Sequence, residues 1–189
     1  MADDQYAEQQ QHDDDGPPPV EQPNFATSGM LARVANTVVV RDRAAPNGAR
    51  AVVRKYHEPS EAAIATRPWT LVVFDPKADD KAAPDIMDLK AKSAYMFGRD
   101  DQLADVFLTH SHASSQHAVL QFRKVSRLTA PHQKKIRPYL IDLESTNGSY
   151  LNKSKVGPAR YVELKPKDVF TFGPGSREYV IMCSDALDS

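Results

Sequence analysis

Three short polar motifs carry the side chains of this sequence that could do chemistry. They are Gly98-Arg99, the run Ser114-Ser115-Gln116-His117, and the run Ser145-Thr146-Asn147-Gly148. Arg99 offers a planar fork of N–H donors that can hold two oxygens of a phosphate group. Ser114 adds a hydroxyl that can donate to a third oxygen. Each motif alone is common, because a Ser-x-x-His run arises by accident and Asn-Gly is an ordinary hairpin turn.

Short extended segments flank all three motifs. Runs rich in β-branched and aromatic residues cover 69–74, 93–97, 105–108, 117–125, 138–143, 149–151, 161–164, 169–172 and 178–182. Turn residues such as Asn147-Gly148 and Gly173-Pro174-Gly175 separate them. No stretch of a dozen residues keeps a helical period, so the pattern predicts an all-β sandwich or barrel.

Residues 117–125 show the alternation expected of a strand between two environments. Ala118, Leu120 and Phe122 would face one way. Val119, Gln121 and Arg123 would face the other way. An alternation with period two places one set of side chains toward a core.

The order and spacing of the three motifs on this β pattern resemble the forkhead-associated (FHA) domain, over about residues 68–183. The resemblance implies an eleven-stranded FHA-type β-sandwich that reads phosphothreonine. Its phosphopeptide-binding residues would be Arg99, Ser114, Ser115, Thr146 and Asn147. Its pocket-supporting residues would be Gly98, His117 and Gly148. Arg99, Ser114 and Thr146 would engage the phosphate and Asn147 the peptide backbone, while Ser115 stands where many such domains have Asn and His112 where a basic residue often stands.

A narrower resemblance extends into the N-terminal part of the chain. The runs that carry it include Gln22-Pro23-Asn24-Phe25, residues 55–62, residues 137–143 and Ser176-Arg177-Glu178-Tyr179-Val180. They resemble the Smad nuclear-interacting protein / pre-mRNA leakage protein family. That resemblance implies a nuclear protein of the pre-mRNA retention and splicing (RES) complex, which joins the activated spliceosome. Its partners would be a phosphothreonine-containing protein, other spliceosome components and an RNA-recognition-motif subunit.

Composition divides the chain into four parts. Residues 1–23 hold seven acidic residues and no Lys or Arg, with Gln and Pro runs, which predicts a disordered tail. Residues 24–67 form an arm with Val-rich extended runs around the turn Pro46-Asn47-Gly48, either a partner-binding linear motif or a segment packed on the domain. Its partner-binding residues would be Asn24, Phe25, Met30 and Leu31. Residues 68–183 would be the FHA domain that the resemblance implies, and 184–189 would be a short C-terminal tail.

The overall charge of −1 excludes a general field for polyanions. Lys134, Lys135 and Arg137 form a modest basic stretch, which we interpret as a solvated loop. The alternatives for this stretch are a nuclear-import signal and an RNA-backbone contact. Because the solvated loop is the preferred interpretation, we expect direct RNA contact to be weak or absent. The single Cys183 excludes an internal disulfide, and the apolar run Trp69–Phe74 is too short to span a membrane. The first residues lack the pattern of a secretory signal.

Other interpretations of the same residues remain open. Arg99 could pair with Asp100 or Asp101, and the hydroxyls of Ser114 and Thr146 could cap turns. A metal site would need His110, His112 and His117, and a hydrolase triad would need Ser114, His117 and Asp142. Neither has the surrounding motifs that such sites require, so we predict a binding protein that is not an enzyme and has no cofactor or metal. The alternatives within binding proteins are a phosphatase-targeting FHA scaffold and a structural FHA subunit with a vestigial phosphate pocket.

Overall fold

Strands and turns make up the structure. It is a computed structural model that describes residues 36–41, 45–78, 83–127 and 130–184. No residue in those ranges lies in an α-helix, and none of the described residues form a helix that could cross a membrane. The strands are β1 (Thr37–Arg41), β2 (Ala49–Val53), β3 (Trp69–Phe74), β4 (Asp85–Asp88), β5 (Ala94–Gly98), β6 (Val106–Phe107), β7 (Ala118–Arg127), β8 (Ala130–Asp142), β9 (Ser149–Leu151), β10 (Ser154–Lys155), β11 (Val162–Glu163), β12 (Val169–Phe172) and β13 (Glu178–Cys183). The predicted all-β class is confirmed.

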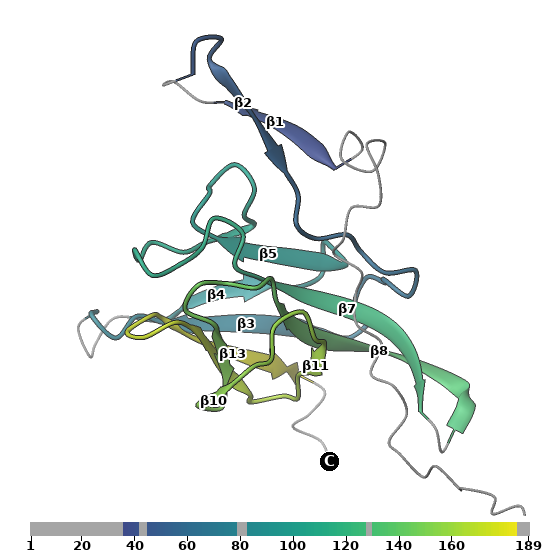
Figure 1. The fold of residues 1–189 in the computed structure, drawn as a ribbon. Coiled ribbons are helices and arrows are strands. Elements are labelled where there is room, and N and C mark those ends of the chain that lie inside the picture. The colour runs from purple at the N-terminus through teal and green to yellow at the C-terminus, as the bar shows by residue number, and fades with distance from the viewer. Residues whose placement is uncertain (1–35, 42–44, 79–82, 128–129, 185–189) are drawn as a thin grey trace, which may run out of the picture.

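Two sheets face each other and hold eleven of the described strands, the number that the FHA resemblance implies (Figure 1). One has six strands in the order β10-β9-β12-β13-β3-β4, and the other has five in the order β11-β8-β7-β5-β6. Neighbouring strands are antiparallel except for β5 and β6, which run parallel. The two sheets form a sandwich whose inner faces supply the core.

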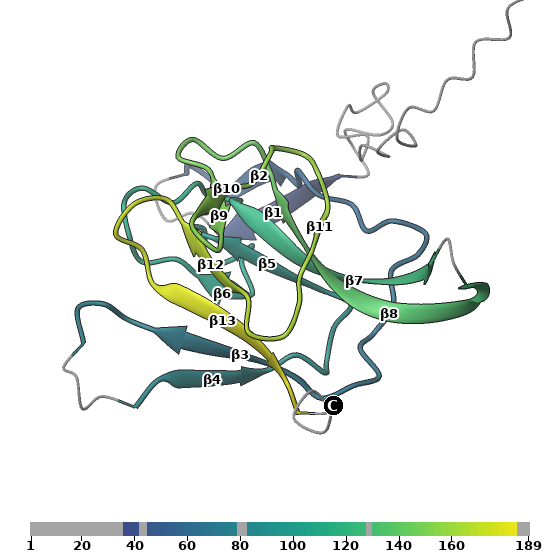
Figure 2. The same cartoon turned by 90° about the horizontal axis from the view of Figure 1, so that it is seen from below.

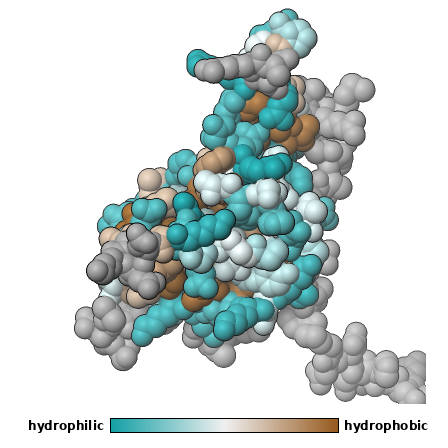
Figure 3. Space-filling model, turned by 90° about the vertical axis from the view of Figure 1, so that its left-hand side faces the viewer, coloured by the Kyte–Doolittle hydropathy of each residue, from teal (hydrophilic) through white to brown (hydrophobic). Residues whose placement is uncertain are grey.

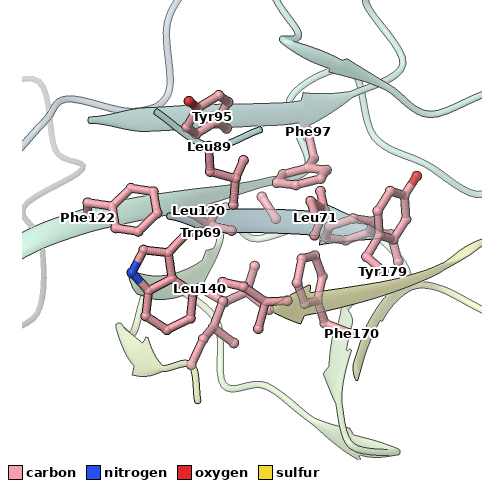
Figure 4. Packing of buried hydrophobic residues seen from close by; sticks show 14 of the residues in the cluster. Trp69, Leu71, Leu89, Tyr95, Phe97, Leu120, Phe122, Leu140, Phe170 and Tyr179 are labelled. Carbon is pink, nitrogen blue, oxygen red and sulfur yellow. The ribbon is translucent and has the colours of Figure 1, made fainter. Parts of the chain in front are cut away.

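The core is richest in aromatic side chains at the end of β5. Figure 4 shows Phe97, Phe170 and Tyr179 together at one end of the core and Trp69 with Phe122 at the other. The Phe97 ring lies edge-on to Tyr179, with centroids 5.5 Å apart, and Phe170 stacks on Tyr179 at 5.6 Å. Each such pair contributes about 0.5–1.5 kcal/mol beyond the area it buries. Because Gly98 and Arg99 directly follow Phe97 in the chain, this packing holds the end of the strand from which the first motif begins.

The predicted alternation in β7 is confirmed, and both of its faces are covered. Ala118, Leu120 and Phe122 belong to the main core between the sheets. Val119 belongs to a second cluster on the outer face of the five-stranded sheet, together with Tyr56. The Tyr56 hydroxyl donates to Gln121 Oε1 at 2.7 Å, so the segment before β3 packs on the sandwich.

The stretch between residues 125 and 138 is not the solvated loop that we expected. β7 continues to Arg127 and β8 already begins at Ala130, with Ser126 paired to Lys134 and Val125 to Lys135. These residues pair beyond the end of the core, so backbone hydrogen bonds hold them without an apolar repeat in the sequence. The short strands β4 and β10 escaped prediction for a similar reason, because they lie at sheet edges and most of their side chains are exposed.

A separate hairpin occupies part of the predicted arm. β1 and β2 pair from Thr37↔Val53 to Arg41↔Ala49, and Gly48 in the connecting turn has a φ of +66°. Figure 1 shows this hairpin standing apart from the two sheets. Gln116 holds its base, since its Oε1 accepts from Lys55 N at 2.9 Å and its Nε2 donates to Val53 O at 2.9 Å. The extended structure expected here is present, while the domain boundaries remain a prediction.

Candidate functional site

The first motif is locked to the second by backbone contacts. A β-carbon added to Gly98 would lie 2.0 Å from the carbonyl oxygen of Ser115, so only glycine fits there. Arg99 N donates to the Ser114 carbonyl at 2.9 Å, and Asp100 N donates to the Ser115 carbonyl at 3.3 Å. The two loops therefore form one unit, with the Arg99 side chain exposed on its surface.

The Arg99 guanidinium has no ion-pair partner among the described residues, because the acid next to it is already paired. Asp100 Oδ2 accepts from Arg50 of β2 at 2.9 Å. Asp100 Oδ1 accepts from the backbone N–H of Gln102 at 3.2 Å. Arg99 keeps its donor fork available for a ligand.

His117 supports the loop from inside. Its side chain is fully buried, and its Nδ1 accepts a hydrogen bond from Ser114 N at 3.1 Å. This bond assigns the proton of the neutral ring to Nε2, which faces the Gly148 carbonyl at 3.4 Å. Burial lowers the pKa of His117, although the Asp142 carboxylate and the Gly148 carbonyl act in the opposite direction. The neutral ring thus connects the second and third motifs through its contacts with Ser114 N and the Gly148 carbonyl.

The third motif depends on the buried carboxylate of Asp142. The sequence did not predict that this carboxylate supports the loop. Asp142 accepts from Ser145 N at 2.9 Å, from Ser145 Oγ at 2.7 Å and from Ser149 Oγ at 2.6 Å. Its Oδ2 also lies 3.9 Å from His117 Nε2. The available signal was the Asp-x-x-Ser spacing, in which an Asp accepts from a backbone N–H a few residues later.

A hydrolase triad does not form from these residues. His117 Nδ1 is occupied by a backbone N–H, and Ser114 Oγ accepts from Thr146 N at 3.2 Å. The hydroxyl proton of Ser114 is therefore free to point toward a ligand while its oxygen joins the two loops. Asn147 Nδ2 donates to the His112 carbonyl at 2.8 Å, which ties the third motif to the loop before the second.

Arg99 and Ser115 open onto one pocket of about 730 Å³. Its other lining residues are Arg41, Arg50, Asp100, Asp101 and Gln102. The contribution of Arg41 and Arg50 was not expected from the sequence, because both belong to the hairpin. Ser114, Thr146 and Asn147 do not line this pocket, although the Ser114 carbonyl accepts from Arg99 N and Ser114 Oγ accepts from Thr146 N. Figure 3 looks onto the left-hand side of Figure 1 and shows a mostly hydrophilic surface, with only small hydrophobic areas.

Of the other predicted site residues, Gly148 occupies a turn with a φ of +78°, and its backbone N–H donates to Ser145 Oγ at 3.0 Å. Asn24, Phe25, Met30 and Leu31 lie outside the described residues.

Comparison with known proteins agrees with this geometry. Residues 95–173 match the family model of the FHA domain, and this segment contains all three motifs. A solved structure of the yeast Pml1 splicing factor, described with its integration into the RES complex, superposes with a TM-score of 0.60. It is 27% identical and covers 68% of this chain and 96% of that one. The fold and the family match therefore show that the chain contains an FHA domain.

Two curated relatives show which FHA-domain proteins are homologous to this chain over more residues than the family model matches. Smad nuclear-interacting protein 1 of Mus musculus is 41% identical over 164 residues, which are 86% of this chain and 39% of the relative. Pre-mRNA leakage protein 1 of Saccharomyces cerevisiae is 32% identical over a 117-residue alignment that covers 54% of this chain and 54% of the relative. The chain is a homologue of these two proteins, and it spans about half or less of their length.

Proposed function

We propose that this chain is a phosphothreonine-peptide-binding subunit of a nuclear RES complex and acts with the spliceosome. The observation that carries the proposal is the exposed guanidinium of Arg99, which has no ion-pair partner among the described residues. It lies on a loop bonded to Ser114 and, through Ser114 Oγ, to Thr146. A phosphothreonine brings about −1.5 to −2 charges and three acceptor oxygens. The names of the yeast relatives support the assignment to splicing, and those of the mammalian relatives support a nuclear location.

Binding would be reversible and would involve no catalysis. Arg99 would hold two phosphate oxygens and the Ser114 hydroxyl a third, with Thr146 beside them and Asn147 on the peptide backbone. Because the surrounding loops are already joined, little ordering would accompany binding. Threonine would be preferred to serine through contacts with its methyl group, which are worth about 1–3 kcal/mol, so phosphoserine would be weakened and not excluded.

The test is a binding screen of the full chain against degenerate peptides that carry threonine, phosphothreonine or phosphoserine. Arg99→Ala should cost about 2–5 kcal/mol of phosphopeptide binding, since it removes a charged partner of the phosphate. The matched control is Arg160→Ala, because Arg160 is also exposed and lies outside the pocket. Binding without phosphate dependence, or equal binding by the Arg99 variant, would leave a structural subunit with a vestigial pocket.

The arm would tie the module to its own complex. Asn24, Phe25, Met30 and Leu31 would bind an RNA-recognition-motif subunit, and the two linked sites would raise the effective concentration of the phosphopeptide partner. A double change of Phe25 and Leu31 to Ala should abolish capture of that subunit and leave phosphopeptide binding intact. Ser28→Ala in the same segment is the control. Capture that survives the double change would remove the arm from the proposal.

A further inference from the structure

A second charged feature lies at the far end of β7 from the phosphothreonine loops. A groove of about 610 Å³ runs between the β7–β8 hairpin, the segment before β3 and the segment after β11. Six cationic residues line it: Arg67, Lys124, Lys134, Lys135, Arg137 and Lys165. Its one acidic lining residue, Glu163, is held by Arg137 in an ion pair. The groove therefore carries a strong positive charge in a chain whose net charge is −1.

Most of this charge is uncompensated. Lys124, Lys134, Lys135 and Lys165 are exposed, and none of the four pairs with an acidic residue in the ranges that the structure describes. Four unpaired lysines on one groove repel one another at a cost that a bound polyanion would remove. A surface kept in this state is suited to an anionic ligand.

The groove is separate from the phosphothreonine site. Lys124 lies six residues along β7 from Ala118, the residue after His117, which at about 3.3 Å per residue places it roughly 20 Å away. Figure 2 shows β7 and β8 continuing past the other strands of their sheet, so the lysines of this hairpin stand away from the motif loops. A ligand in the groove would not compete directly with a phosphopeptide.

We propose that this groove binds the phosphate backbone of a nucleic acid. The alternative polyanion is an acidic protein segment, but protein–protein interfaces are depleted in lysine and centre on exposed aromatic or aliphatic anchors. Of the large apolar lining residues, Trp69 and Leu164 are only 4% and 2% exposed, and Ile136 is partly buried against the core. Protein–nucleic acid interfaces are polar and strongly positive, as this one is.

The chemistry of the lining also sets the kind of recognition. Lysine offers a mobile point charge and no planar fork, and buried Trp69 is not available for stacking on a base. Binding would therefore be insensitive to base sequence and strongly dependent on salt. This inference goes beyond the phosphopeptide function and revises the expectation that direct RNA contact is weak or absent.

The experiment measures binding of the full chain to a labelled single-stranded RNA of about 20 nucleotides, from roughly 50 to 200 mM salt. Parallel measurements with single-stranded DNA and with duplex RNA show which kind of nucleic acid the groove binds. Neutralising three or four phosphates predicts a log–log salt slope of about −2 to −3, at ~0.7 per phosphate for single strands. The double variant Lys134→Gln, Lys135→Gln should weaken binding about tenfold at low salt and flatten the slope by about one.

The control is the double variant Lys90→Gln, Lys153→Gln, which removes the same charge from exposed positions outside the groove. Equal weakening by both pairs, or no RNA binding at the lowest salt, would overturn the proposal. So would displacement of the RNA by polyglutamate as efficiently as by polyuridylate of the same charge, which would indicate an acidic protein ligand. Arg99→Ala should leave RNA binding unchanged, so the failure of one function would not be mistaken for the failure of the other.

Discussion

At the start of β7, buried polar groups hold the loops that carry Arg99 and Ser114. Toward its other end, Lys124, Lys134 and Lys135 are exposed and have no acidic partner in the part of the chain that the structure describes. The first site uses one carboxylate and one neutral ring, Asp142 and His117, to fix the positions of backbone N–H groups and hydroxyls. The second has no such internal network around its lysines. A site that reads one phosphate in one orientation needs fixed donors, while a backbone-binding surface needs only charge density.

The comparison predicts that the largest loss of stability follows from removing Asp142. Asp142→Ala should lower the free energy of unfolding by about 3–5 kcal/mol, because three donors lose a buried acceptor. Urea unfolding measures it. Asp168→Ala is the matched control, since Asp168 also accepts from Asn152 Nδ2 at 2.9 Å and Lys165 N at 2.7 Å but is more exposed, and it should cost about 1 kcal/mol. Equal losses in the two variants would mean that the Asp142 network is not special to the site.

Gly98→Ala should have the next largest effect. The added β-carbon would meet a backbone oxygen, which cannot rotate away as a side chain can, so a loss of about 1–3 kcal/mol is expected together with weaker phosphopeptide binding. Gly175→Ala separates crowding from backbone conformation, because Gly175 has a φ of +66° and nothing within 4 Å of the added atom. That control should leave peptide affinity intact. A Gly98 variant with native peptide affinity would contradict the interpretation that close backbone packing at Gly98 holds the first two motifs together.

Acid should weaken the first site before it affects the second. Burial lowers the pKa of both His117 and His110 in the folded protein. The unfolded chain therefore binds more protons below its histidine pKa of about 6.5, and stability should fall as the pH drops below that value, by up to about 1.4 kcal/mol per pH unit for each group. Urea unfolding at about pH 7.5 and 5.5 measures this. His117→Gln and His110→Gln apportion the slope, and an unchanged slope in the His117 variant would show that this ring is not held neutral.

The smallest effect on stability is expected in the lysine groove. Lys134→Gln with Lys135→Gln should change the free energy of unfolding by no more than about 0.5 kcal/mol, because neither lysine has an ion-pair partner among the residues described. Relief of mutual repulsion would make any change slightly stabilising. Thermal unfolding at low and high salt measures both effects. A large destabilisation would mean that these lysines support the β7–β8 hairpin and are not held ready for a ligand.

Local pattern determined much of this protein. The alternation of Ala118, Leu120 and Phe122 with Val119 and Gln121 reflects the two-residue period of a strand, which is a property of the backbone alone, and the structure places these residues accordingly. The order of the three motifs likewise carried the FHA resemblance, which the comparison with known proteins confirms.

Only the tertiary structure could decide the contacts between distant segments. Arg50 reaches Asp100 across 50 positions, and the basic groove joins Arg67 to Lys165. In the sequence, little distinguishes Asp142 from the other acidic residues. The fold buries it, and a carboxylate becomes a structural acceptor only when burial removes water as its competitor. The sequence by itself determined most of the core strands, the motifs and their order. Which charges lie together, and which of them are buried or free, depended on how the sheets close, since side chains interact through space and not along the chain.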